Sequence, residues 1–506
     1  MSPMSPLSPL SPLSPTNGSP MHREIVIIGG GATAVAAFTQ VVRTPGIASV
    51  TTVDPNPVGL GHAFGVTDPM LLCNTSADVT SLRPDGPSDL LDYLTERGWA
   101  ARPEDFVPRY LVGHYCRERY LAGRREAERQ GIAVSHHPAR ATAVRSTADG
   151  YRVELADGRR LSATDVLVCL GLDRPRLPEL LRPYDGHPRL LPQPYPTDRL
   201  RALPEKAEVL VLGTKLSAID AALVLCAGGR RTVMASPSGG LPAVRTRLCR
   251  PDRPLLDSRR WQRLDPRAED LDRELTRLLL RAIGRAGSGL GLRAQTSAAA
   301  VPDERLREEL ALAAAGRVPW QDVIAEVIDA INAWTAPWDP ALRAEVLARY
   351  RGLMSRYISS IPARNARLLS GHLDTGRLAL APGYPVGIEP AADDDGWQVE
   401  WPDGRRERFT HVVCGTGFHT PQLDMAAPGH YRIGPSVTHG AAPAITEELR
   451  LCDPQRGSVE RIWVLGAAAH PRTAIVNYLN TAAKQAQRVA AQLTATARTA
   501  PSVLAA

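Results

Sequence analysis

The sequence predicts an α/β protein built from two three-layer domains, each formed around a parallel sheet. Two strand–turn–helix units carry this prediction: an apolar run over 24–28 leads into three glycines at 29–31, and a run over 209–212 leads into Gly213. Each unit is followed by a hairpin, with turns at 157–158 and 403–404, and then by a strand that ends in glycine. The same order of elements twice along the chain indicates two related units.

The order of these units predicts that one domain is split around the other. We expect the first domain over 21–175 and 405–495, and the second over 200–400. Apolar positions at helical spacing predict a helical insertion over about 261–371, with helices near 267–284, 319–334 and 340–358. The Ser/Pro-rich stretch 1–20 is expected to be a disordered tail, and the end of the chain, 496–506, a flexible one.

Composition excludes several classes of function. The 506-residue chain has a formal charge of +7, but its basic residues are nearly all arginines scattered along the sequence, which argues against a nucleic-acid partner. No apolar run approaches the roughly 18–20 residues that span a bilayer, and no secretory signal is recognisable, so we expect a cytoplasmic protein without a membrane partner. The seven cysteines form no CxxC pair, which argues against a metal site.

The first glycine turn matches the dinucleotide-binding fingerprint GxGxxG/A. Gly29 permits the tight turn, Gly31 lets the backbone approach a pyrophosphate, and Ala34 lets the helix pack on the strand. Asp54 follows at the expected end of the next strand, where a carboxylate accepts a hydrogen bond from a ribose hydroxyl. We therefore predict a Rossmann-like dinucleotide site, the alternative being a helix of small residues that packs without a ligand.

The second turn, GTKLSA over 213–218, has a lysine where the fingerprint has its second glycine. Lys215 either neutralises a phosphate or blocks the site, and the sequence leaves both alternatives open. Downstream, Ser236, Arg245 and Arg247 offer groups for a 2′-phosphate. We predict a nicotinamide site that prefers NADPH, the alternative being a degenerate domain kept for structure. Its candidate residues are Gly213, Thr214, Lys215, Ser217 and Ser236.

Further motifs follow in a characteristic order. GHAFGV over 61–66 precedes LLCNTSA over 71–77, and PDGP over 84–87 precedes a short expected helix near 90–94. FVPRYLVGHY over 106–115 and CGTGFH over 414–419 come later. In these motifs the chain resembles an FAD/NAD(P)-binding family of flavoproteins with two dinucleotide-binding domains, and its layout is similar to class B flavin monooxygenases and amine N-hydroxylases. The resemblance covers nearly everything from 24 to 493.

The resemblance implies FAD and NADPH as cofactors. The residues of the first turn and Asp54 would hold the ADP half of FAD, Asn74 would lie near the isoalloxazine, and Arg109 would reach the flavin side. A helix expected over 473–493 and entered at Thr473 would direct its N-terminal N–H groups at the flavin pyrimidine. Asn477 and Asn480 are polar candidates near that end. Gly417 and Gly466 complete the candidate cofactor residues, and loop structure is the alternative for Asn74 and Arg109.

We therefore expect an FAD-dependent, NADPH-consuming monooxygenase. Its expected reaction is N-hydroxylation of a primary amine of a small amino-acid-like substrate with O₂, through a C4a-(hydro)peroxyflavin, with Asn74 and Asn477 at the reaction centre. Two alternatives stay open: a flavin-dependent oxidoreductase without oxygen insertion, and a non-catalytic FAD-binding protein. The second is supported by Lys215 and by Ala467, which stands where many flavoproteins have an aspartate. The oligomeric state is left open, a homo-oligomer included.

Overall fold

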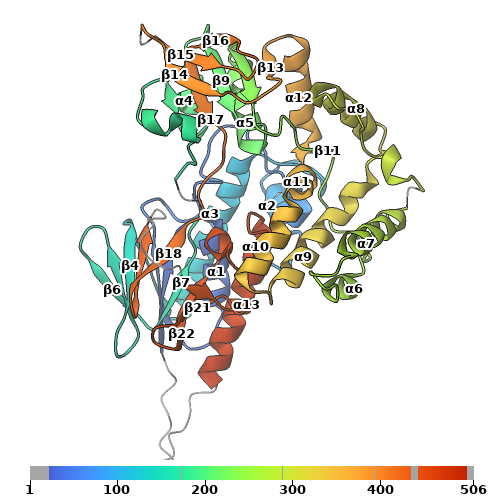
Figure 1. Cartoon of the computed structure of the whole chain (residues 1–506). Helices are drawn as coiled ribbons and strands as arrows, with labels where there is room; N and C mark the ends of the chain where they lie inside the picture. Colours follow the sequence, from blue (N-terminus) through green and yellow to red (C-terminus); the bar gives the residue numbers. More distant parts are fainter. Residues whose placement is uncertain (1–21, 173, 288, 394, 435–442, 499–506) are drawn as a thin grey trace, which may run out of the picture.

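The computed structural model describes residues 22–172, 174–287, 289–393, 395–434 and 443–498. It has two parallel sheets, and a group of helices packs beside them (Figure 1). The expected α/β class with Rossmann-like units is therefore confirmed. The tail expected over 1–20 and the last eight residues of the tail expected over 496–506 lie outside the described residues. No helix within the described ranges is long and apolar enough to cross a membrane.

The first unit is a seven-stranded sheet in the order β20-β21-β22-β7-β1-β2-β3. The strands from β22 to β3 run parallel, and β20 and β21 extend one edge in the antiparallel sense. The strands are β1 (Arg23–Ile28), β2 (Ile47–Val53), β3 (Ala133–His137), β7 (Asp165–Val168), β20 (Ala444–Ile445), β21 (Arg450–Asp453) and β22 (Ser458–Val464).

Alternate side chains of β1 face different layers. Ile25 and Ile27 pack with α1 (Ala32–Val41), α3 (Arg109–Arg129) and α13 (Leu479–Arg498), whereas Val26 and Ile28 pack on an antiparallel sheet, β18-β19-β4-β5-β6. Because successive side chains of a strand point to opposite faces, a continuous apolar run is buried on both sides. The strands of the second layer are β4 (Ala141–Ser146), β5 (Tyr151–Leu155), β6 (Arg160–Ala163), β18 (Gln422–Ala427) and β19 (His430–Gly434).

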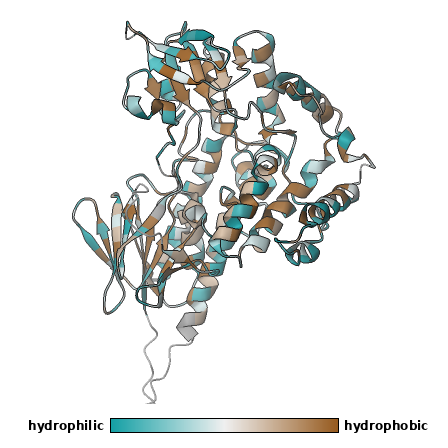
Figure 2. Ribbon diagram, viewed as in Figure 1, coloured by the Kyte–Doolittle hydropathy of each residue, from teal (hydrophilic) through white to brown (hydrophobic). Residues whose placement is uncertain are grey.

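The second unit repeats this construction. Its five parallel strands lie in the order β13-β10-β9-β17-β8, with α5 (Leu216–Ala227) on one face and the hairpin strands β14 to β16 on the other. Figure 2 shows the hydrophobic residues of both units concentrated along the strands. The strands are β8 (Leu190–Leu191), β9 (Glu208–Leu212), β10 (Arg231–Ala235), β13 (Leu378–Leu380), β14 (Gly387–Pro390), β15 (Trp397–Glu400), β16 (Arg406–Phe409) and β17 (His411–Cys414).

The chain returns to the first unit later than the sequence places the boundary. β17 pairs with β9 and β8 in the second sheet, so the return follows Cys414 rather than 405. Two linkers connect the units side by side: the Arg176 N–H donates to Gly417 O (3.0 Å), and the His419 N–H donates to Arg174 O (3.0 Å). Gly417 therefore lies in a paired crossing between the units.

The helical insertion leaves the second unit after β10 and rejoins it at β13. It holds the three helices expected from the apolar spacing and adds others, above all α8 (Pro302–Ala314). The other helices of the insertion are α6 (Ser258–Gln262), α7 (Leu271–Arg285), α9 (Ile324–Thr335), α10 (Pro340–Arg349), α11 (Arg351–Leu353) and α12 (Ala363–Asp374). Two further helices, α2 (Asp89–Glu96) and α4 (Asp198–Arg201), lie outside it. Short helical turns span Ala77–Val79, Glu179–Tyr184, Leu292–Ala294, Pro319–Val323, Met354–Ile358 and Gly466–Ala469, and a small bridge joins β11 (Val244–Arg245) to β12 (Ile361–Pro362).

Candidate functional site

The first glycine turn lies at the carboxyl end of β1 and leads directly into α1. Gly29 has a φ of +110°, and a Cβ there would lie 2.4 Å from the carbonyl oxygen of Cys169 on the neighbouring strand, so only glycine fits. Gly31 is the N-cap of α1, and Ala34 is buried beneath it. The free N–H groups of the first helical turn therefore face the end of the sheet, where an anion is stabilised.

A second glycine segment covers this turn. The Gly59 N–H donates to Gly30 O (2.7 Å), and a Cβ on Gly61 would lie 2.6 Å from the Cα of Gly31. Two backbones thus meet without a side chain between them, beside the N-terminus of a helix. A cradle that a Cβ would fill is what a pyrophosphate needs, so the residues present fit a dinucleotide. The sequence shows GHAFGV over 61–66 only as a family motif. The close approach of Gly61 to Gly31 could not be predicted from it, because the two residues lie in different segments.

Asp54 holds the turn in place. It is the first residue after β2, and its carboxylate accepts hydrogen bonds from the Gly30 N–H (2.7 Å) and the Asn56 N–H (2.7 Å). Each carboxylate oxygen has a further lone pair, so Asp54 can also accept a ribose hydroxyl. The acidic residue found from its spacing therefore lies at the glycine turn, as its predicted role requires.

The end of β22 also borders the first glycine turn. Gly466 has a φ of +66°, and a Cβ there would lie 2.5 Å from Thr33 Oγ1 at the start of α1. Gln485 of α13 accepts from the Gly466 N–H (2.8 Å) and donates to Thr473 Oγ1 (3.1 Å). Gln485, which the sequence did not single out, therefore joins Gly466 to Thr473, and Gly466 itself lies against the start of α1.

The C-terminal helix begins later than expected. α13 starts at Leu479 rather than Thr473, and the segment before it is irregular. Asn477 is exposed, whereas Asn480, in the first turn of α13, is buried and accepts from Arg250 (3.0 Å). The chain is coil and bends over 473–478, so the N-terminal N–H groups of the helix belong to residues near 479–481 and not 473–475.

The second glycine turn brings its predicted residues together. Gly213, with a φ of +121°, approaches the carbonyl of Gly415 as Gly29 approaches Cys169. Thr214 donates to Gly240 O (2.9 Å) and contacts the Ser236 hydroxyl (2.8 Å), and the Lys215 ammonium donates to the same Gly240 carbonyl (3.0 Å). Burial and nearby Arg356 lower the pKa of Lys215. Ser217 is half-buried in the first turn of α5.

Arg245 and Arg247 do not form the 2′-phosphate site that the sequence suggested. Arg247 makes a two-pronged ion pair with Asp322 (both contacts 2.8 Å). Arg245 is fully buried and donates to the backbone carbonyls of Ile358 and Asn74. Burial lowers the pKa of Arg245 to about 10. Both side chains are thus committed to partners other than the loop of Ser236, which proximity in sequence could not reveal.

The segment 72–78 forms a seam: Arg109 of the first unit contacts one end of it, and residues 245–249, which follow β10 of the second unit, contact the remainder. Arg109 Nε donates to Leu72 O (3.1 Å), and Arg245 donates to Asn74 O. The Leu248 N–H donates to Ser76 Oγ (2.7 Å), and the Cys249 thiol contacts the Asp78 carboxylate. Asn74 is half-buried in the middle of this seam. The chain bends at residues 74 and 75 and enters a short helical turn at Ala77, so this segment is not a continuous strand.

Arg109 joins the seam to the second unit. Its guanidinium donates to Asp220 on α5 (2.7 Å) and to the Tyr195 hydroxyl (3.2 Å), and that hydroxyl donates to Asp220 (2.6 Å). Burial raises the pKa of Asp220, and the charge of Arg109 opposes this rise. Arg109 was predicted to lie on the flavin side, and the structure places its charge in an interunit ion pair. Asp220 and Tyr195 could not be found from a motif.

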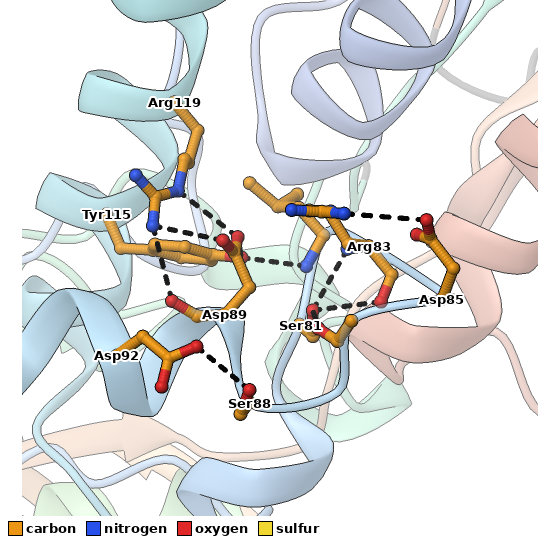
Figure 3. Close-up of polar contacts among 10 residues, drawn as sticks. Ser81, Arg83, Asp85, Ser88, Asp89, Asp92, Tyr115 and Arg119 are labelled. Atoms are coloured by element: carbon orange, nitrogen blue, oxygen red, sulfur yellow. Dashed lines mark hydrogen bonds and ion pairs between the residues drawn. The ribbon is translucent and has the colours of Figure 1, made fainter.

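The short helix α2, which follows PDGP, is held against α3 by buried side chains. The buried Asp89 accepts from Tyr115 (2.5 Å) and Arg119 (3.2 Å) of α3, and Ser81 closes the preceding turn by donating to Gly86 O (2.7 Å) (Figure 3). These contacts hold α2 on α3 and thereby support the end of the seam. The 84–87 motif therefore has a structural explanation that needs no ligand.

Two glycine turns, each at the carboxyl end of a parallel sheet, give the chain two Rossmann-like units. Residues 26–173, which include the first turn, the seam and Arg109, match the model of a family described as FAD-NAD(P)-binding. The chain thus carries an FAD/NAD(P)-binding domain, as the sequence motifs indicated. A search of the curated proteins gives no significant match.

Comparison of structures agrees with this class. The fold is similar to an ornithine hydroxylase from Pseudomonas aeruginosa (TM-score 0.57, 12% identity) and an ornithine N-hydroxylase from Kutzneria sp. 744 (TM-score 0.58, 14% identity). A doubly substituted mutant of a flavin monooxygenase from Stenotrophomonas maltophilia is also similar (TM-score 0.51, 16% identity). Each comparison covers 94% of this chain and 99% of the other. The chain therefore has the fold of flavin-dependent monooxygenases over almost its whole length.

Proposed function

We propose that the protein is an FAD-dependent, NADPH-consuming monooxygenase that N-hydroxylates a primary amine of a small amino-acid-like substrate. The observation that carries the proposal is the glycine cradle of Gly31 and Gly61, together with a second glycine turn at Gly213, in the two parallel sheets of one monooxygenase-like fold. The first unit, interrupted between its linkers, would hold FAD, and the unit between the linkers would hold NADPH.

The residues divide the work between binding and positioning. Gly29, Gly31 and Gly61 would hold the pyrophosphate of FAD against the N-terminus of α1, and Asp54 the ribose. Gly466, Thr473 and Gly417 would line the remainder of the cofactor site. When bound, FAD supplies electron transfer from NADPH and the activation of O₂.

The seam would bring the flavin side against the nicotinamide unit. Asn74 would lie at the reaction centre, since its carbonyl is held by Arg245 and its neighbour Leu72 by Arg109. The exposed Asn477 lies just before α13, whose free N–H groups would face the flavin. At the second turn, Thr214, Lys215, Ser217 and Ser236 would hold the phosphates of NADPH. We favour a supporting role for Lys215, because its ammonium lies at the loop that carries Ser236.

A flavin-dependent oxidoreductase without oxygen insertion is the second candidate, because the same glycine turns serve both reactions. The test is purification with bound flavin, followed by NADPH oxidation with a panel of primary amines and detection of hydroxylamine products. We expect amine-dependent NADPH consumption and a hydroxylamine. Oxidised product without hydroxylamine would favour the second candidate, and a bound flavin that NADPH does not reduce would favour a non-catalytic FAD-binding protein.

A further inference from the structure

A pocket of about 460 Å³ lies within the helical insertion, and four of its lining residues are arginines. Arg247, Arg250, Arg253 and Arg285 line it, against the two acidic residues Asp252 and Asp322. Four positive and two negative charges leave an excess of two positive charges in the wall. This pocket is distinct from the two glycine turns.

The arginines are unequally neutralised. Arg247 is paired with Asp322, and Arg250 shares Asp329 (2.9 Å) with Lys484. Arg285 donates to the Leu255 carbonyl (3.0 Å), and within the described ranges neither Arg253 nor Arg285 has a carboxylate partner. A guanidinium presents a planar fork of donors that matches an oxyanion. Two such groups in one pocket fit a ligand with two oxyanion groups.

The pocket adjoins the proposed reaction centre. Cys249, in its wall, contacts Ser76 and Asp78 of the seam, and Arg250 donates to Asn480 at the start of α13. Asp78 lies behind Cys249, and Asp329, Lys484 and Glu326 lie behind Arg250, so the positive excess belongs to the lining residues alone. A small ligand bound here would therefore lie beside the seam segment that carries Asn74.

From this charge and position we propose that the pocket binds an acidic amine, a primary amine that carries two oxyanion groups, as the substrate of the proposed reaction. That the acidic amine is a substrate rests on the proposed function, whereas its binding rests on the pocket alone. The solved structures similar in fold include two named as ornithine hydroxylases. The side-chain ammonium of ornithine would meet the unpaired guanidinium groups here and be repelled, so this chain selects against such a basic amine.

Calorimetric titration of the flavin-loaded protein without NADPH tests the binding directly. The probes are L-aspartate, L-glutamate and O-phospho-L-serine as acidic amines, with L-alanine and L-ornithine as neutral and basic ones. We expect the acidic amines to bind at least about tenfold more tightly than L-alanine, and L-ornithine to bind more weakly than L-alanine. Aspartate and glutamate represent two carboxylates and phosphoserine a carboxylate with a phosphate, so their order identifies the second oxyanion.

The variant Arg253→Gln/Arg285→Gln should weaken the binding of the acidic amines at least about tenfold more than that of L-alanine, which has only one carboxylate to lose its partner. Arg281→Gln changes an exposed arginine of the same helix α7 outside the pocket and should leave every affinity unchanged. Ornithine binding as tightly as the acidic amines, or acidic binding that survives the double substitution, would overturn the inference.

The two proposals fail separately. Acidic binding without NADPH-dependent oxygen insertion would leave the pocket assigned and overturn the proposed function. Hydroxylation of a neutral or basic amine by a protein that binds no acidic amine would do the opposite.

Discussion

Loss of the Asp220 charge should destabilise the protein strongly. Asp220→Asn leaves the size of the side chain unchanged but removes the negative charge that faces Arg109 at 2.7 Å, with the two side chains 5% and 18% exposed. Removing one partner of a buried ion pair typically costs about 3–5 kcal/mol, because the other charge stays buried without compensation. Since Arg109 keeps some exposure and two neutral partners, we expect about 2–4 kcal/mol.

Urea unfolding followed by tryptophan fluorescence measures this loss. Asp270→Asn, which breaks the exposed Arg273–Asp270 pair of α7, is the matched control and should cost no more than about 0.5 kcal/mol. Arg109→Met/Asp220→Leu should cost less than the sum of the single substitutions, because no unpaired charge is left. An Asp220→Asn variant within about 0.5 kcal/mol of the control would refute the claim that this pair fastens the units together.

Three further predictions concern the two glycine turns and the seam. Gly31→Ala should fold normally, because its Cβ would lie 3.6 Å from Gly61. It should bind FAD at least about tenfold more weakly, whereas the control Gly371→Ala should bind FAD as the unchanged protein does. Full FAD occupancy of Gly31→Ala would contradict the role of this glycine in the cradle. Lys215→Met should weaken NADPH binding about tenfold while the exposed-lysine control Lys206→Met does not; tighter binding would mean that the lysine blocks the site. Burial raises the pKa of Asp78 to about 6, so the native state binds this proton more tightly than the unfolded state and stability falls as the pH rises from about 4 to 6. Asp78→Asn should therefore stabilise by about 1 kcal/mol at pH 8 and have little effect at pH 4, and urea midpoints that shift equally at both would disprove this.

The repeated strand–turn–helix units could be predicted because their signals are local. Apolar runs such as that of β1 reveal buried strands, and the glycines at 29–31 and 213 reveal the turns. α3 was not expected as a helix, because its second half is rich in arginine and glutamate and has little apolar periodicity. The boundary near 405 came too early, because pairing of β17 with β9 is a long-range contact.

The candidate site could be predicted only where one segment holds the whole signal. The first turn with Asp54, and the second with Lys215, are such segments. The ion pair of Arg109 with Asp220 and the arginine pocket join residues more than 30 positions apart, and nothing local marks them. Arg245 and Arg247 show the converse, because closely spaced residues of an irregular segment can still face unrelated partners.

The claim of oxygen insertion is tested most directly by the mass of the product. Purified, flavin-loaded protein is mixed with NADPH, an amine that stimulates NADPH oxidation and isotopically labelled O₂. The account predicts a product that is heavier than the amine by one labelled oxygen atom and that reacts as a hydroxylamine. A product of changed oxidation state that contains no labelled oxygen, with all the consumed O₂ recovered as hydrogen peroxide, would contradict it.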